Sequence, residues 1–154
     1  GGVDQILFSS DDATSTSDVF DGGKVVLANT DPTNTAGTKV DLAAADYVEI
    51  TSTGTMVDNK VNVLTDTAGF ASVTAAMNAV DDNGTQAAND ASILLVFHNS
   101  TDGEVQLHYV SEIGTSANNY TDETTVELAA FSDIAVDGIA AAFSVANFGV
   151  YSEG

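Results

Sequence analysis

Acidic and amide side chains gather directly after the segment with the clearest helical spacing. The oxygen-bearing residues of this stretch are Asp81, Asp82, Asn83, Asn89 and Asp90. Calcium takes about six to eight oxygens from carboxylates, amides and carbonyls, so suitable ligands are present. A carboxylate at the C-terminal end of a helix costs roughly 0.3–1 kcal/mol, and a bound cation would reverse that cost. A calcium site is therefore one hypothesis for this loop, but a solvated polar loop fits at least as well, because the spacing is not that of an EF-hand.

A second group of acidic residues lies near the start of the chain. Asp11 and Asp12 are its candidate calcium ligands, and Asp18 and Asp21 follow them. A third group of acidic and amide residues lies within residues 118–123. Each group alone also fits a solvated turn, but the recurrence of such groups in one acidic chain favours Ca²⁺ as the expected cofactor.

The two histidines, His98 and His108, are the other side chains that could do chemistry. They lie on the two arms of a predicted hairpin. If residue 98 is opposite residue 104 or 105, then His108 is opposite residue 94 or 95, which places the two too far apart for a shared metal. The chain has no Gly-x-Ser-x-Gly motif for a nucleophilic serine. We therefore interpret them as strand-surface histidines and expect no catalytic residue, with an extracellular or halophilic hydrolase as an alternative.

Charge is the outlying property of the composition. The 23 acidic residues are balanced by only three lysines, which gives a net charge of −20. Self-repulsion of this kind destabilises a compact fold unless cations reduce it, as in a calcium-rich extracellular medium or a high-salt cytoplasm. Nucleic acid is not an expected partner, because almost no cation is available for phosphate. No apolar run approaches ~18 residues, so we expect no membrane insertion.

The core is predicted between residues 91 and 110. Ile93–Phe97 is a continuous apolar run, which is typical of a strand covered on both faces. Val105–Tyr109 alternates between apolar and polar residues, which predicts a strand covered on one face. The Asp102-Gly103 pair between them suits a residue at positive φ and predicts a hairpin turn.

Residues 68–80 carry the best helical pattern, with about three turns expected and a cap from Asp66 or Thr67. The apolar residues at helical spacing are Phe70, Val73, Met77 and Val80. Short strands are predicted at residues 6–8, 19–20, 24–28, 47–53, 61–64, 125–131 and 144–151, and helical turns at 41–46 and 137–143. The expected fold is one domain over residues 1–154. It is α+β and β-rich, with a mostly antiparallel sheet or sandwich and one principal helix.

The order of elements from Val61 onward resembles a known protein family. The elements are Val61–Asp66, the alanine-rich helix, the strand Ile93–Phe97, the Asp102-Gly103 turn, Val105–Tyr109 and Val126–Phe131. This order is similar to the C-terminal regions of bacterial calcium-binding surface proteins of the RTX type, which are exported by type I secretion. The glycine-rich nonapeptide of that family is not present. The resemblance implies an extracellular, non-enzymatic module that depends on calcium.

The composition favours a structural function. A chain that is acidic, free of cysteine and rich in Thr, Asn and Asp is typical of prokaryotic extracellular or cell-surface proteins. We expect a module that self-assembles into a homo-oligomer or polymer (filament, surface layer or matrix) or mediates adhesion. The alternative is a monomeric ligand-binding or secretion-targeting domain of a larger secreted protein. The apolar terminal segments are the expected assembly surfaces, with the residues Ile6, Leu7, Phe8, Phe148, Val150 and Tyr151.

Overall fold

The fold is taken from a computed structural model. It describes residues 5–10, 18–20, 23–24, 37, 39–51, 54–57, 60–65, 68–82, 92–111 and 124–152.

Short strands make up most of the described part of the chain. The strands are β1 (Ile6–Ser10), β2 (Asp18–Phe20), β3 (Gly23–Lys24), β4 (Lys39–Asp41), β5 (Tyr47–Ile50), β6 (Thr55–Met56), β7 (Val61–Leu64), β8 (Asp81–Asp82), β9 (Ile93–Asn99), β10 (Glu104–Ser111), β11 (Thr124–Phe131) and β12 (Phe148–Ser152). The helices are α1 (Val73–Ala79) and α2 (Ile139–Ala142), and the 3-10 turns are η1 (Ala44–Asp46), η2 (Val136–Gly138) and η3 (Val145–Asn147). The prediction of a β-rich chain is confirmed.

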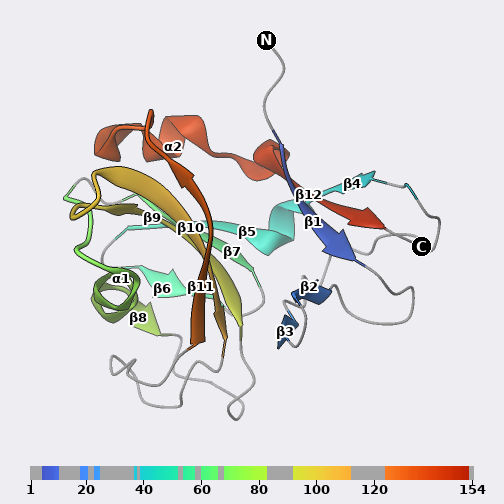
Figure 1. The fold of residues 1–154 in the computed structure, drawn as a ribbon, viewed down its shortest axis with the longest axis horizontal. Helices are drawn as coiled ribbons and strands as arrows, with labels where there is room; N and C mark the ends of the chain where they lie inside the picture. Colours follow the sequence, from blue (N-terminus) through green and yellow to red (C-terminus); the bar gives the residue numbers. More distant parts are fainter. Residues whose placement is uncertain are drawn as a thin grey trace.

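The large sheet has five strands in the order β11-β10-β9-β7-β5 (Figure 1). β9 and β10 form the predicted hairpin, and Gly103 in its turn has a φ of 75°. β10 continues antiparallel into β11, whereas β7 and β5 lie parallel to β9 and to each other. β9 is therefore the central strand.

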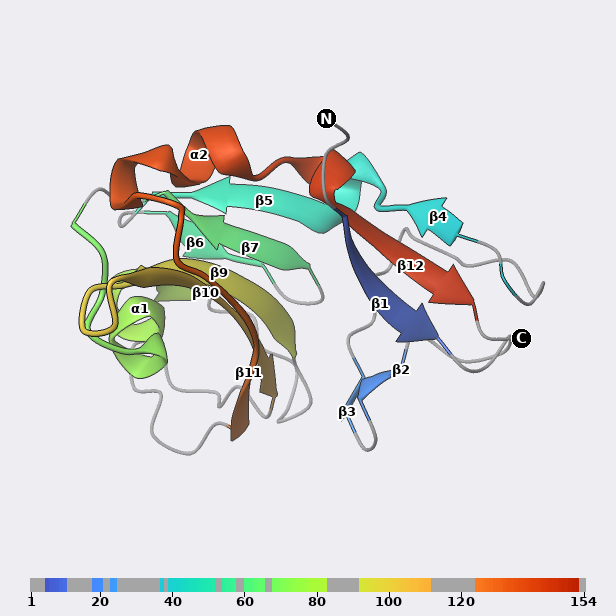
Figure 2. The same ribbon diagram turned by 45° about the horizontal axis from the view of Figure 1, so that its top comes forward.

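The small sheet joins the two ends of the described chain. Its order is β1-β12-β4, with β1 parallel and β4 antiparallel to β12. Figure 2 shows this sheet beside the large one, with α2 above β5 of the large sheet. The register pairs Ile6 with Phe148 and Phe8 with Val150.

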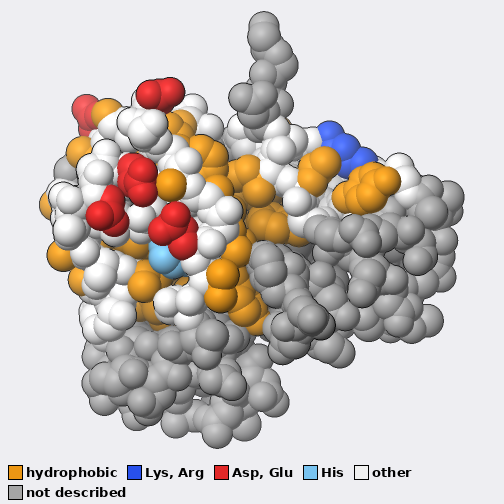
Figure 3. All heavy atoms as spheres, in the orientation of Figure 1, with side chains coloured by type: hydrophobic (Ala, Val, Ile, Leu, Met, Phe, Trp, Pro, Cys, Tyr) orange, Lys and Arg blue, Asp and Glu red, His pale blue; other side chains and the backbone are white. Residues whose placement is uncertain are grey.

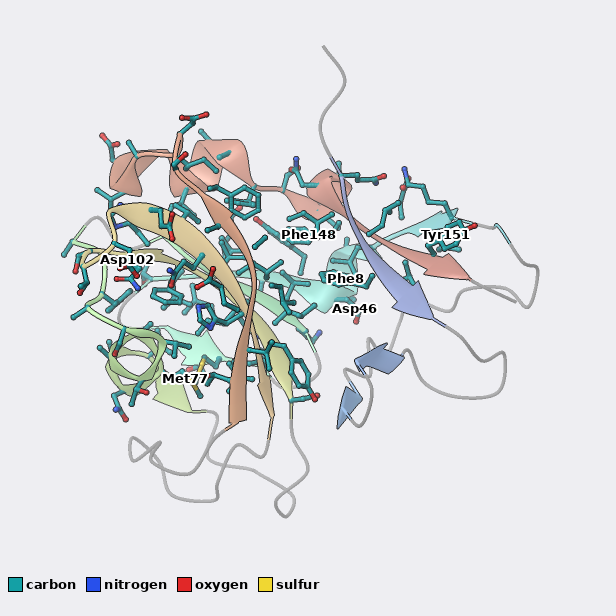
Figure 4. The ribbon with its side chains drawn as sticks, viewed as in Figure 1. Phe8, Asp46, Met77, Asp102, Phe148 and Tyr151 are labelled. Carbon is teal, nitrogen blue, oxygen red and sulfur yellow. The ribbon has the colours of Figure 1, made fainter. Side chains whose placement is uncertain are left out.

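Apolar side chains cover both faces of the large sheet. On one face, Leu94 and Val96 pack with Phe8 and Phe148 of the small sheet. On the other face, the residues Ile93, Leu95 and Phe97 pack with Ala76, Met77 and Val80 around α1. Figure 4 shows Phe8 and Phe148 on the side of the small sheet and Met77 on the side of α1. The prediction of a strand buried on both faces is confirmed for Ile93–Phe97, all of which is 0% exposed.

The principal helix is shorter than predicted. α1 begins after Ser72, whose hydroxyl accepts a hydrogen bond from the Ala75 amide at 3.1 Å. Phe70 is not helical, because its amide donates to the His98 carbonyl and its carbonyl accepts from Ser100, both at 2.8 Å. These bonds tie the chain before Ser72 to the end of β9. The predicted cap at Asp66 or Thr67 is therefore wrong, and the helix is a minor element.

The prediction of a mostly antiparallel arrangement holds only in part. Among the described strands, four of the eight strand pairs are parallel, namely β1 with β12, β5 with β7, β6 with β8 and β7 with β9. Alternation of residue types reports which face of a strand is buried, but it does not report the direction of the neighbouring strand. In the described residues, no helix is long and apolar enough to cross a membrane.

Candidate functional site

Two places in the described structure combine polar or exposed groups in a way that could support a function. The first is a partly buried set of polar residues on the β9–β10 hairpin, here called the hairpin polar cluster. Its members are Asn99, Asp102, Glu104, Gln106 and His108. The second is the outward side of the small sheet, here called the terminal-sheet face. Its members are Leu7, Lys39, Asp41, Gly149 and Tyr151.

Asn99 organises the turn of the hairpin. Its Oδ1 accepts hydrogen bonds from the amides of Thr101 at 2.9 Å and Asp102 at 3.3 Å. Its Nδ2 donates to Asp102 Oδ2 at 2.7 Å and to Gln106 Oε1 at 3.0 Å. The amide side chain thus fixes the turn on one side and anchors β10 on the other.

Gln106 is the centre of the cluster and is only 4% exposed. Its Nε2 donates to Asp102 Oδ2 at 3.2 Å and to Glu104 Oε1 at 3.1 Å. Because carboxylates only accept, these two bonds fix the orientation of the amide. Gln106 Oε1 is therefore the atom that lies 3.1 Å from His108 Nε2, so that nitrogen must carry the proton.

His108 is held as a neutral ring. With the proton on Nε2, the Nδ1 atom is an acceptor, and it is buried without a partner among the described residues. The ring contacts Phe97 at a centroid distance of 5.4 Å. Burial lowers the pKa of His108 below 6.5, and the opposing effect of Glu127, its neighbour on β11, is smaller.

The interpretation of His108 as a strand-surface histidine is wrong, because the residue is only 8% exposed. The prediction that Val105–Tyr109 is covered on one face fails for the same reason. Gln106 can be buried because its amide is satisfied by Asn99, Asp102 and Glu104, and it provides His108 Nε2 with a partner in turn. Alternation of polar and apolar residues gave no sign of this, since a polar side chain with an internal partner has the same sequence pattern as an exposed one.

The two histidines lie on opposite faces of the large sheet. His98 pairs with Val105 and His108 pairs with Leu95, which confirms the expected register. Val105 packs toward the small sheet and Leu95 toward α1. The His98 ring lies against Gly69, because a Cβ added to this glycine would be only 2.7 Å from His98 Nδ1. The pair therefore cannot share a ligand.

The expected calcium ligands are mostly outside the described residues. Asn83, Asn89, Asp90, Asp11 and Asp12 all lie there. Asp81 and Asp82 form β8, whose backbone pairs with β6, so they belong to a short strand instead of the predicted loop. Within the described part of the chain, no group of three or more His, Asp or Glu residues is placed to hold a metal ion.

The terminal-sheet face is built by strand register. Leu7 pairs with Gly149, Gly149 with Asp41, and Tyr151 with Lys39. Leu7 is 45% exposed and Tyr151 is 39% exposed. They are two of the three exposed large hydrophobic residues among those described, and the third is Val126 on β11. The face is therefore an apolar surface with a cation and an anion at one side.

Gly149 lies in the middle of this face and is buried, because its neighbours already cover it. A Cβ at this residue would be 2.9 Å from the Val40 carbonyl oxygen and 3.1 Å from Leu7 Cδ2. Asp41 accepts a hydrogen bond from Gln5 Nε2 at 3.0 Å, and its Oδ1 lies 3.9 Å from Lys39 Nζ. Figure 3 shows basic side chains beside apolar ones here, while acidic side chains gather on the part of the molecule that holds β10 and β11.

The structure separates the six residues expected in assembly. Phe8, Phe148 and Val150 are buried in the core, and Ile6 is partly buried against it. Leu7 and Tyr151 alone have side chains available to a partner, and Figure 4 shows Tyr151 on the small sheet. The sequence prediction missed Lys39 and Asp41, although the polar-apolar-polar order of residues 39–41 is a signal for one solvent-facing side.

No protein-family model matches the chain, and no curated protein and no solved structure matches it either.

Proposed function

We propose that the chain is a non-enzymatic structural module that associates with copies of itself outside a prokaryotic cell, supported by calcium. The observation that carries the proposal is the terminal-sheet face. It leaves Leu7 and Tyr151 exposed on a flat sheet surface, next to one lysine and one aspartate. Exposed apolar side chains that cluster on a sheet favour contact with another surface.

The free energy available from burying the apolar side chains of the face predicts a weak, reversible contact between two copies. Burying the exposed part of Leu7 and of Tyr151 contributes about 1 kcal/mol each by area, in every copy. Charges oppose association elsewhere, because each chain carries a net charge of −20. The terminal-sheet face escapes this repulsion, since Lys39 and Asp41 cancel. Association through it is therefore expected at high concentration.

Calcium enters the proposal through the total charge. At the same concentration, calcium reduces the repulsion between acidic copies more effectively than a monovalent ion does. The reason is that carboxylate oxygens bind calcium directly. The predicted ligands are Asp81, Asp82, Asn83, Asn89, Asp90, Asp11 and Asp12. Removing calcium with a chelator at constant ionic strength should lower the melting temperature and the particle size. If both stay unchanged, calcium has no part in the function.

A pair of variants tests the surface. Leu7→Ser combined with Tyr151→Ser should reduce the sedimentation coefficient of the associated species and leave far-UV circular dichroism unchanged. Val126→Ser is the matched control for this face, because the residue is 43% exposed but lies on β11, so the species joined through the terminal-sheet face should stay unchanged. Loss of association in the control alone would contradict the proposal. A chain that stays monomeric at millimolar concentration with calcium would favour the secretion-targeting or ligand-binding alternative.

A further inference from the structure

We infer that two copies join face to face about a two-fold axis, so that Tyr151 of each packs on the partner's Leu7 and Lys39 of each pairs with the partner's Asp41. The inference rests on the proposed function, because it specifies how the terminal-sheet face is occupied. The occupant is a second copy of this chain. The order of residues on the three strands supports this arrangement.

The face has two rows of residues across β1, β12 and β4. One row holds Leu7, Gly149 and Asp41, and the next row along the strands holds Tyr151 and Lys39. The two rows are two residues apart, about 7 Å. Tyr151 and Gly149 are thus neighbours on β12, and Lys39 and Asp41 are neighbours on β4.

A two-fold axis between the two faces and perpendicular to the strands exchanges these rows. Each strand then lies over the same strand of the partner, running in the opposite direction. Tyr151 comes over the partner's Gly149, where it meets the Leu7 side chain that leans over that glycine. Lys39 meets the partner's Asp41, and each contact occurs twice. Facing sheets lie about 10 Å apart, a gap that a tyrosine and a leucine can fill together.

An axis parallel to the strands gives a poorer match. It would place Tyr151 on the partner's Tyr151, and two large rings cannot share a gap of that width. It would also place β1 over the partner's β4, which leaves Lys39 without an opposite charge. The perpendicular axis alone satisfies both the shape and the charges of the face.

The two charges on the face are exposed and only weakly paired with each other, although Asp41 also accepts a hydrogen bond from Gln5. The side chains of Lys39 and Asp41 are 46% and 77% exposed, and their own contact is long at 3.9 Å. Exposed pairs of this kind contribute little within one chain. In the two-fold arrangement the four charges sum to zero. This is the property that allows two chains of −20 each to approach at this surface.

Charge reversal tests the inference. Lys39→Asp puts four carboxylates in the paired faces, and Asp41→Lys puts four ammonium groups there, so each variant alone should associate about tenfold or more weakly. An equimolar mixture of the two should restore association as heterodimers, and the double variant K39D/D41K should restore it as homodimers. Sedimentation velocity and native mass spectrometry of the intact chains measure both, and circular dichroism verifies folding.

The control is Asp137→Lys, which makes the same change in net charge as Asp41→Lys at an exposed position in η2. The mixture of D137K with K39D is compared with the mixture of D41K with K39D. If both associate equally well, the overall charge is responsible and not the pairing of Lys39 with the partner's Asp41, and the inference is overturned. If mixing fails while Leu7→Ser with Tyr151→Ser still abolishes association, the two-fold arrangement is wrong and the proposed function stands. If the unaltered chain never associates, the proposed function fails with it.

Discussion

Replacing Gln106 by leucine should destabilise the chain through its effect on His108. Gln106 occupies the centre of the hairpin polar cluster, where its amide joins Asn99 and His108 to two carboxylates. Leucine fills a similar volume but accepts no hydrogen bond. Asn99 keeps its bond to Asp102 at 2.7 Å, so it loses only part of its support. His108 loses the partner of Nε2 while Nδ1 is already without one.

The expected magnitude follows from that loss. A buried donor left unpaired costs about 1–3 kcal/mol, and the two hydrogen bonds from Gln106 Nε2 go to exposed or half-buried carboxylates that water can solvate. We therefore expect Gln106→Leu to lower the free energy of unfolding by about 2 kcal/mol. His108→Phe should cost less, about 1 kcal/mol or below, because it removes the unpaired Nδ1 together with the bond to Gln106.

A double-mutant cycle identifies the source of the effect. In Gln106→Leu with His108→Phe, the buried donor is gone, so the double variant should be more stable than the sum of the singles predicts by about 1 kcal/mol. Urea unfolding monitored by circular dichroism measures all four chains. Costs that add within about 0.3–0.5 kcal/mol would refute the reasoning, since they would mean that Gln106 and His108 are not coupled.

Three further predictions concern other parts of the molecule. The pKa of His108 is lowered in the folded state, so its neutral form contributes stability above pH 6.5 that is lost as pH falls through the folded pKa. In His108→Phe, the urea midpoint of unfolding should therefore change less between pH 7 and pH 5.5 than in the unaltered chain. Ser72→Ala removes the cap of α1 and should lower the free energy of unfolding by about 1 kcal/mol, and an unchanged midpoint would exclude that cap. Because the chain has no cysteine, Lys39→Cys mixed with Asp41→Cys should be linked as a heterodimer by a short bifunctional maleimide that spans the gap of about 10 Å between facing sheets, more efficiently than Lys39→Cys alone.

The elements that the sequence predicted well are those fixed by local pattern. The apolar run Ile93–Phe97 required cover on both faces, and the short turn at Asp102-Gly103 fixed the register of β9 and β10. Val61–Leu64 forms a strand over the predicted residues. In each case one stretch of fewer than about ten residues contains all the physical information that the element needs.

The predictions that failed depended on partners distant in sequence. Phe70 fits a helical face by spacing, but its backbone bonds to His98 and Ser100, which lie almost thirty residues later. Gln106 and His108 have the pattern of exposed strand residues, and only the hydrogen bonds formed in the folded hairpin allow burial. The parallel pairing of β1 with β12 joins the two ends of the described chain. Local periodicity contains no information on such contacts.

The candidate assembly surface shows the same division. The apolar segments at residues 6–8 and 148–151 were evident from the sequence, but which residues face outward depends on pairing with β4. That pairing puts Leu7 and Tyr151 outside and Phe148 inside. It also brings Lys39 and Asp41 to the edge of the apolar surface. The charges that make the face self-complementary are therefore a product of the three-stranded sheet and not of any single segment.

A two-fold contact closes on itself, so it gives a dimer and cannot by itself extend into a filament or layer. Growth beyond the dimer needs a second surface. The edge strand β11 is the best placed, because no described strand lies on its outer side and its residues Thr125, Val126 and Glu127 are exposed. Under the proposed function, calcium would act differently at each stage. The terminal-sheet face is neutral and needs no shielding, whereas contact between the acidic surfaces around β11 does. Removal of calcium should therefore reduce any larger particle to the dimer before it separates the dimer into single chains.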